Sequence, residues 1–136
     1  MEPAAYVLFD ELHEQFDEFR SILSGKNSIP IRLLCRMCAY NSSDCSVEVI
    51  SPTKGNEFPC LVVSASYLPD EEKQNLAGAA SKERLVQFTG DLTALEHTRG
   101  YKLNAFASAF MDGVDLSVYR SIVELTRPYI KYLPPL

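Results

Sequence analysis

Residues 31–40 read Ile31-Arg32-Leu33-Leu34-Cys35-Arg36-Met37-Cys38-Ala39-Tyr40, and apolar side chains occupy every second position from Ile31 to Ala39. In a β-strand, successive side chains point to opposite faces, so a period of two separates one buried face from one exposed face. The stretch therefore predicts a strand with one buried face, and the rest of the fold is interpreted outward from it.

Four further strands are predicted downstream of this one. Residues 45–50 alternate after the turn residues Asn41 to Asp44, which makes a hairpin with the first strand. Residues 58–65 form a third strand and residues 85–90 a fourth, with a short polar helix or loop starting at residues 68–72 between them. In the fifth strand, one face carries Tyr101, Leu103, Ala105, Ala107 and Ala109, and the other carries Lys102, Asn104, Phe106, Ser108 and Phe110.

Five strands in a three-plus-two arrangement, with the irregular segment between the third and the fourth, are typical of the OB fold. The predicted fold class is all-β with flanking helices: a five-stranded Greek-key barrel with a C-terminal α-helix and an N-terminal amphipathic segment. We expect that segment over residues 1–29, and the OB-fold domain over residues 30–136 with its helix at 116–127.

The N-terminal segment has an apolar residue at every third or fourth position, which is one face of a helix. This face carries Ala5, Phe9, Leu12, Phe16, Phe19 and Leu23, and the opposite, solvent-facing side is expected to carry Asp10, Glu11, Glu14, Asp17, Glu18 and Arg20. Gly25 is expected to take the left-handed position at the end of the helix. The segment either closes one end of the barrel, as a helix or a helix plus an extended stretch, or serves as a partner-binding arm.

The chain of 136 residues carries a net charge of −5, whereas proteins that neutralise DNA phosphates by themselves usually show a basic surface. It therefore either contacts no nucleic acid or contributes little inside a larger assembly. Met1-Glu2-Pro3 does not resemble a signal peptide, and no run approaches the ~18 apolar residues of a membrane helix. We expect a protein of the cytosol or nucleus with reduced cysteines.

A metal site is not expected at the four cysteines, Cys35, Cys38, Cys45 and Cys60. Strand alternation places Cys35 and Cys38 on opposite faces, where they cannot share one ion. Neither His13 nor His97 has a neighbour that completes a triad or an acid–base pair, and glycine-rich phosphate loops are absent. The sequence therefore predicts no enzyme, no cofactor and no small-molecule substrate.

Three stretches resemble known families. Residues 31–40 resemble the opening strand of the small OB-fold subunit, the Ten subunit, of the CST telomere-capping complex. The spacing from Gly90-Asp91-Leu92 through Arg99-Gly100 to Tyr129 is similar to that subunit almost without gaps. The tail from Val114-Asp115-Leu116-Ser117-Val118-Tyr119 onward also resembles the smallest subunit of replication protein A.

The resemblance implies a heterodimer in which the C-terminal helix packs beside a helix of a larger, Stn-like OB-fold subunit. The helix carries apolar residues over a width sufficient for two surfaces, although all of them could instead cover the barrel. The expected partner contacts are Val118, Tyr119, Ile122, Val123, Thr126, Arg127 and Tyr129. Tyrosine and arginine are enriched in binding hot spots, but Arg127 could equally be a solvated cation at the helix end.

A weaker expectation is direct contact with single-stranded DNA inside the complex. Cations and aromatic rings that share a sheet face can hold a DNA backbone and stack bases, although ordinary surface residues look the same. The candidates are Arg32, Arg36 and Tyr40 on one face of the first strand, and Lys102 and Phe106 on one face of the fifth.

The sequence thus favours a non-catalytic small subunit of a telomeric, CST-type complex that binds single-stranded DNA in the nucleus. Such a subunit would stabilise its larger OB-fold partner for telomere end protection and replication. The smallest subunit of replication protein A is the alternative within the same architecture. A protein-interaction adaptor unrelated to DNA is the alternative from another class.

Overall fold

The computed structural model describes residues 3–53, 58–79, 82–98 and 100–136. Met1, Glu2 and Arg99, which entered the sequence interpretation, lie outside the described residues. Among the helices described, none is both long and apolar enough to cross a lipid bilayer.

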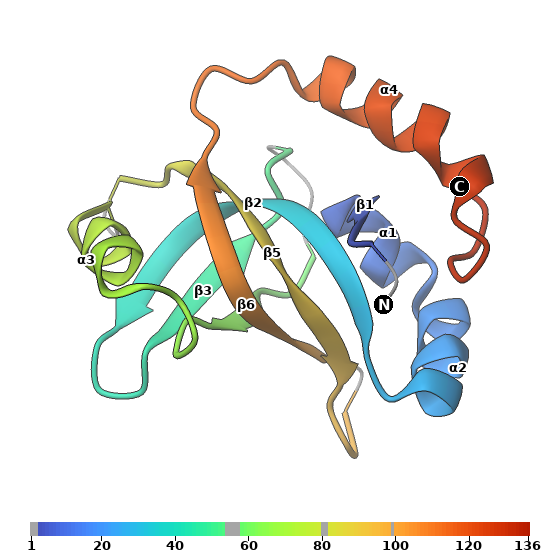
Figure 1. Ribbon diagram of the computed structural model, residues 1–136, viewed down its shortest axis with the longest axis horizontal. Coiled ribbons are helices and arrows are strands. Elements are labelled where there is room, and N and C mark those ends of the chain that lie inside the picture. The colour runs from blue at the N-terminus through green and yellow to red at the C-terminus, as the bar shows by residue number, and fades with distance from the viewer. Residues whose placement is uncertain (1–2, 54–57, 80–81, 99) are drawn as a thin grey trace.

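A closed five-stranded barrel forms the centre of the molecule (Figure 1). Its strands are β2 (Ile29–Asn41), β3 (Ser46–Ile50), β4 (Leu61–Ser64), β5 (Leu85–Ala94) and β6 (Tyr101–Phe110). They pair in the order β2-β3-β4-β6-β5, and β5 pairs with β2 to close the barrel. Only the β4–β6 pairing within this described barrel is parallel. With α3 (Asp70–Ala79) between β4 and β5, this layout confirms the predicted OB fold.

Two sets of flanking elements lie on the same side of the barrel (Figure 1). The N-terminal set is β1 (Ala5–Val7), α1 (Phe9–Glu14) and α2 (Phe16–Lys26), and the C-terminal set is α4 (Leu116–Thr126) with the 3-10 turn η1 (Arg127–Tyr129). Strand β1 runs parallel to β2, pairing with residues 31–33, whereas β3 pairs with residues 36–41. Strand β1 therefore pairs with the first part of β2, ahead of the β3 pairing and on the edge opposite β5.

The N-terminal segment shares one hydrophobic core with the barrel. The predicted apolar face is buried, comprising Ala5, Phe9, Leu12, Phe16, Phe19 and Leu23. It belongs to a short strand and two helices, because the helical geometry is interrupted at Gln15 (φ −113°, ψ 41°). The segment thus closes the barrel as helices plus an extended stretch. The expectation for Gly25 is wrong: α2 continues to Lys26, and Asn27 takes the positive φ of 66°.

Two β-bulges change which side chains face outward. In β2 the register shifts between Met37 and Ala39, so Tyr40 lies opposite the buried Val47 and packs against the core. In β6, Gly90 pairs with Ala105 and Thr89 with Ala107, which leaves Phe106 as the extra residue.

The bulge at Phe106 reverses the predicted faces of the second half of β6. Ser108 lies opposite the fully buried Phe88, and Phe110 packs partly against the core. Ala107 and Ala109 consequently point to the other side. Lys102 and Phe106 share the outer face, as expected, and both are exposed.

Gly90 allows β5 and β6 to approach closely at this bulge. A Cβ at Gly90 would lie 2.2 Å from the Asn104 carbonyl oxygen and 2.7 Å from the Ala105 Cα. Because backbone atoms cannot move aside cheaply, we expect Gly90→Ala to lower the free energy of unfolding by about 1–3 kcal/mol. Gly78→Ala in α3, where nothing lies within 4 Å, is the matched control and should be neutral or slightly stabilising. Urea denaturation measures both, and equal stabilities of the two variants would contradict this account of the bulge.

Candidate functional site

Helix α4 begins at a side-chain cap. The Asp115 carboxylate accepts hydrogen bonds from the backbone N–H of Ser117 (2.9 Å) and Val118 (3.4 Å). The Ser117 hydroxyl also donates to it at 2.6 Å, and these hydrogen bonds lower the pKa of Asp115. The cap fixes where the helix starts and so which residues face the barrel.

The inner face of α4 is anchored by Tyr119 and Val123, which are 5% and 0% exposed. They form a small apolar cluster with Leu34 of β2. The Tyr119 ring lies edge-on to Tyr6, with ring centroids 5.9 Å apart, and its hydroxyl donates to the Gln87 side chain at 3.1 Å. Burial raises the pKa of Tyr119, so the phenol stays a neutral donor.

A second apolar surface of α4 faces solvent. Val118, Ile122, Leu125 and Tyr129, spaced by four, three and four residues, are 54%, 40%, 72% and 83% exposed. This set is called the docking stripe below. Contiguous exposed apolar residues of this kind mark interaction sites. The helix therefore carries apolar side chains on two surfaces, and they do not all cover the barrel.

Three of the seven predicted partner residues lie inside the chain. Tyr119 and Val123 cover the barrel, and Arg127 is only 4% exposed. Thr126 is partly buried, and its hydroxyl donates to the Ile122 carbonyl at 2.9 Å. The exposed surface thus retains Val118, Ile122 and Tyr129 from the prediction and adds Leu125.

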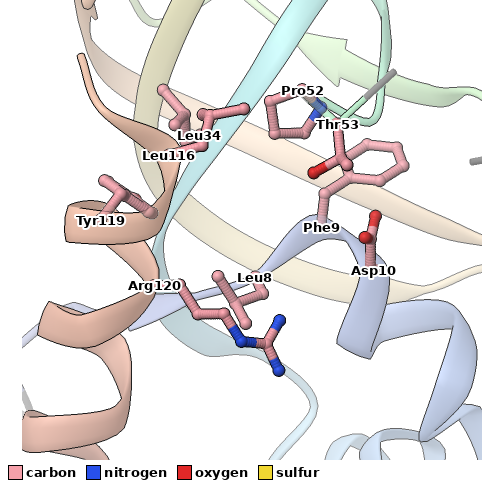
Figure 2. Close-up of a pocket in the computed structure, with 9 residues that line it drawn as sticks. All are labelled: Leu8, Phe9, Asp10, Leu34, Pro52, Thr53, Leu116, Tyr119 and Arg120. Carbon is pink, nitrogen blue, oxygen red and sulfur yellow. The ribbon is translucent and has the colours of Figure 1, made fainter. Parts of the chain in front are cut away.

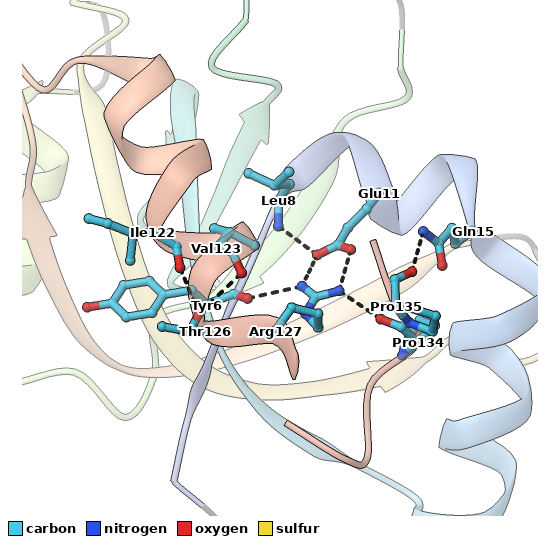
Figure 3. Close-up of polar contacts among 10 residues, drawn as sticks. All are labelled: Tyr6, Leu8, Glu11, Gln15, Ile122, Val123, Thr126, Arg127, Pro134 and Pro135. Carbon is cyan, nitrogen blue, oxygen red and sulfur yellow. Dashed lines mark hydrogen bonds and ion pairs between the residues drawn. The ribbon is translucent and has the colours of Figure 1, made fainter. Parts of the chain in front are cut away.

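Arg127 is the centre of a buried polar network (Figure 3). Its Nη1 donates to Glu11 Oε2 at 2.7 Å, and its Nη2 donates to Glu11 Oε1. The same guanidinium reaches the carbonyl oxygens of Pro134 (3.0 Å) and Tyr6 (3.2 Å). Arg127 is therefore neither a surface anchor nor a solvated cation. Glu11, expected to face solvent, is 3% exposed.

A small cavity lies between the N-terminal half of α4 and the start of α1 (Figure 2). Its volume is about 70 Å³, which suits a few water molecules or one small side chain rather than a nucleotide. It is lined by Leu8, Phe9, Asp10, Leu34, Pro52, Thr53, Leu116, Tyr119 and Arg120. The lining is mixed, with apolar side chains beside the polar groups of Asp10, Thr53 and Arg120.

Two of the five predicted DNA-contact residues line an open groove on the outer face of β2, β5 and β6. Arg32 and Phe106 border it together with Pro3, Ala4, Pro30, Thr89 and Asp91. Arg32 donates to the Tyr6 hydroxyl at 3.1 Å and lies 5.3 Å from the centre of its ring. Phe106 is 50% exposed. The groove thus combines the cation of Arg32, the carboxylate of Asp91 and the half-exposed ring of Phe106.

The other candidate DNA residues are placed differently. Arg36 donates to the carbonyl oxygens of Glu83 (3.0 Å) and Pro52 (3.1 Å), so its guanidinium joins two loops. The bulge in β2 turns Tyr40 to the opposite face, which corrects the expectation that Arg32, Arg36 and Tyr40 share one side. Lys102 is exposed on the outer face of β6.

The cysteines follow the strand geometry. Cys35 is fully buried and Cys38 is exposed, which confirms that they point to opposite faces of β2. Burial raises the pKa of both thiols. Within the described part of the chain, no three histidine, cysteine or acidic residues are grouped so that they could hold a metal ion.

His13 contacts two aromatic rings. Its ring stacks on Phe58 (centroids 5.2 Å apart, planes 13° apart) and lies 5.2 Å from Phe9. Burial lowers the pKa of His13 below its usual 6.5, against a smaller opposing effect of Asp10.

The unfolded chain therefore takes up a proton at His13 more readily than the folded chain. We expect the free energy of unfolding to decrease as the pH falls from 7.5 through 6.5 toward 5.5. Denaturation curves across this range should show a shallower decrease for His13→Gln. An identical slope in the variant would remove His13 as a source of acid sensitivity.

Comparison with known proteins connects the chain to solved OB-fold structures. No family model and no curated protein sequence matches it. Replication protein A of U. maydis bound to single-stranded DNA is similar at 11% identity, over 95% of this chain and 94% of that chain, with a TM-score of 0.51. The S. pombe Stn1–Ten1 complex is similar at 9% identity, over 74% and 77%, with a TM-score of 0.39. These two structures belong to the families that the sequence resembles, and the likeness to the replication protein A chain, at 11% identity, shows the fold alone.

Proposed function

We propose that the chain is the small, non-catalytic subunit of a complex that binds single-stranded DNA in the nucleus. It docks through the exposed face of α4 onto a helix of a larger OB-fold subunit. Its role is to cover that helix and hold the partner's OB domain in a form competent for binding DNA.

The observation that carries the proposal is the docking stripe. Tyr119 and Val123 pack α4 against the barrel and β1, whereas Leu125 and Tyr129 stay exposed and contribute little to the packing of the chain itself. Apolar side chains spaced by three and four residues on a fixed helix match the apolar face of a second helix. The Tyr129 ring, 83% exposed, is the kind of aromatic anchor found in binding hot spots.

The finer proposal is a telomere-capping complex of the CST type. The first strand and the spacing from Gly90 to Tyr129 favour it, as given above. The likeness to replication protein A over nearly the whole chain supports the alternative of a replication subunit with the same architecture. The net charge of −5 would also suit an adaptor that contacts only protein.

Purification of the tagged chain from its own cells, with the partners identified by mass spectrometry, distinguishes these possibilities. A larger OB-fold subunit recovered with telomeric DNA supports the capping complex. The large and middle subunits of replication protein A would move the function to replication. A stable partner without an OB fold, in an assembly that does not bind single-stranded DNA, would overturn the proposal in favour of the adaptor.

Direct DNA contact within the complex is proposed for Arg32, Lys102 and Phe106. If Phe106 stacks on a base, Phe106→Ala should weaken binding of single-stranded DNA by the complex by about 1–3 kcal/mol. The salt dependence of DNA binding should be the same for Phe106→Ala as for the parent chain. Lys102→Ala should reduce the slope of the logarithm of the binding constant against the logarithm of salt concentration by about one.

Fluorescence anisotropy of a labelled oligonucleotide at several salt concentrations measures these effects. Tyr67→Ala is the aromatic control, since Tyr67 is 76% exposed and does not line the groove. Equal effects of Phe106→Ala and Tyr67→Ala would exclude a specific contact at Phe106.

A further inference from the structure

Helix α4 lies on the N-terminal segment as much as on the barrel. Strand β1 runs beside α4, and Tyr6 and Leu8 join Tyr119 and Val123 in the cluster beneath the helix. Figure 3 shows Tyr6 and Leu8 of this segment beside Val123 of α4. Residues from the two ends of the chain therefore form one support for the docking stripe.

The ion pair of Glu11 and Arg127 locks this support at the C-terminal end of the helix. Two hydrogen bonds join the carboxylate to the guanidinium, and both side chains are almost completely buried. Glu11 Oε1 also accepts the Leu8 N–H at 2.9 Å, which holds the turn from β1 into α1. One guanidinium thus ties the end of β1, helix α1 and the C-terminal tail to the end of α4.

The neutrality of this network depends on Glu11. No other carboxylate among the described residues is hydrogen-bonded to Arg127, whose remaining contacts are carbonyl oxygens. The Arg127 Nε is buried without a hydrogen-bond partner in the described structure. Removing the Glu11 charge would leave a cation in a buried site, which is strongly unfavourable. The end of α4 would then move so that Arg127 could reach water.

Such a movement would reach the docking stripe directly. Arg127 is the first residue of η1, and only Pro128 separates it from Tyr129. The fixed φ of proline transmits the position of Arg127 to the next residue with little freedom. Ile122 and Leu125 lie within the last two turns before Arg127.

We propose that Glu11 is a positioning residue for partner binding, which acts through Arg127 to hold Ile122, Leu125 and Tyr129 in one docking-competent geometry. This inference rests on the proposed function. Only the fraction of molecules with the stripe in place binds, so a loosened helix end weakens apparent affinity without any change in the contact residues. The N-terminal segment thus contributes to partner binding by supporting the docking stripe.

The first test uses the isolated chain and hydrogen exchange followed by mass spectrometry or NMR. Glu11→Gln keeps the size of the side chain and removes its charge. We expect exchange from Ile122 to Tyr129 to accelerate by about tenfold or more beyond any change in the β5 and β6 strands of the barrel. Glu14→Gln, an exposed acid on the same helix, is the control and should not alter exchange. Equal loss of protection across the whole barrel would overturn the inference, because Glu11 would then serve general stability only.

The second test measures affinity for the partner subunit recovered with the parent chain. Glu11→Gln should weaken association by about tenfold or more, and Glu14→Gln should not. Ile122→Arg changes the docking stripe itself, so it tests the stripe as the partner surface separately from the positioning role of Glu11. If Ile122→Arg abolishes binding and Glu11→Gln leaves it unchanged, the positioning role is overturned and the docking stripe stands. If Ile122→Arg binds normally, the proposed function fails, and the positioning role with it.

Discussion

Arg127→Met is expected to lower the free energy of unfolding by about 3–5 kcal/mol, because it leaves the buried Glu11 carboxylate without its cation. Methionine fits the space of the arginine stem but donates none of the hydrogen bonds to Glu11, Pro134 and Tyr6. Guanidinium chloride denaturation at pH 7, with circular dichroism as the probe, measures the change.

The double variant Glu11→Met with Arg127→Met is the control. Replacing both members of a buried ion pair with apolar residues is often neutral or stabilising. We therefore expect the double variant to be more stable than Arg127→Met. A single variant within about 1 kcal/mol of the parent chain would contradict the account, since that is the value of an exposed ion pair.

Ile122→Arg is expected to remove partner binding while the chain remains folded. Ile122 lies in the middle of the docking stripe and is 40% exposed, so a longer charged side chain can be accommodated in the free subunit. In the complex the same charge would be buried against an apolar helix without a counter-ion. The loss of association energy should be at least about 2 kcal/mol, or roughly thirtyfold in affinity.

The matched control for this prediction is Glu124→Arg. Glu124 is also exposed on α4 but lies about 200° around the helix from Ile122, and its ion pair with Arg120 is a surface pair worth little. Glu124→Arg should bind the partner nearly as well as the parent chain. Tyr129→Ala should behave like Ile122→Arg, with an unchanged fold and weakened binding. Equal binding by all three variants would place the interface elsewhere.

Most of the barrel could be predicted from the sequence, because apolar residues at every second position indicate a strand with one buried face. The faces of Tyr40, Ser108 and Phe110 could not. Each follows a β-bulge, and one extra residue reverses the alternation from that point onward. A bulge is set by how the two strands pair across the barrel, and this pairing is not visible in either strand by itself.

The candidate site was predictable in outline. The width of the apolar surface on α4 indicated that not all of it covers the barrel, but the period of the helix does not say which residues meet the barrel. That choice depends on β1 and on Glu11, which is 116 residues away from Arg127 in the chain. An acid in an acidic helix predicts solvent exposure, and nothing local to Glu11 indicates a buried cation beside it.

The most direct test of the account is site-specific photo-crosslinking in cells, with a benzophenone amino acid placed at Leu125 in one strain and at Glu124 in another. The account predicts that the probe at Leu125 crosslinks to a helix of a larger OB-fold subunit and that the probe at Glu124 does so much less. Crosslinking of that subunit from an outer barrel position such as Val62, with none from Leu125, would contradict it.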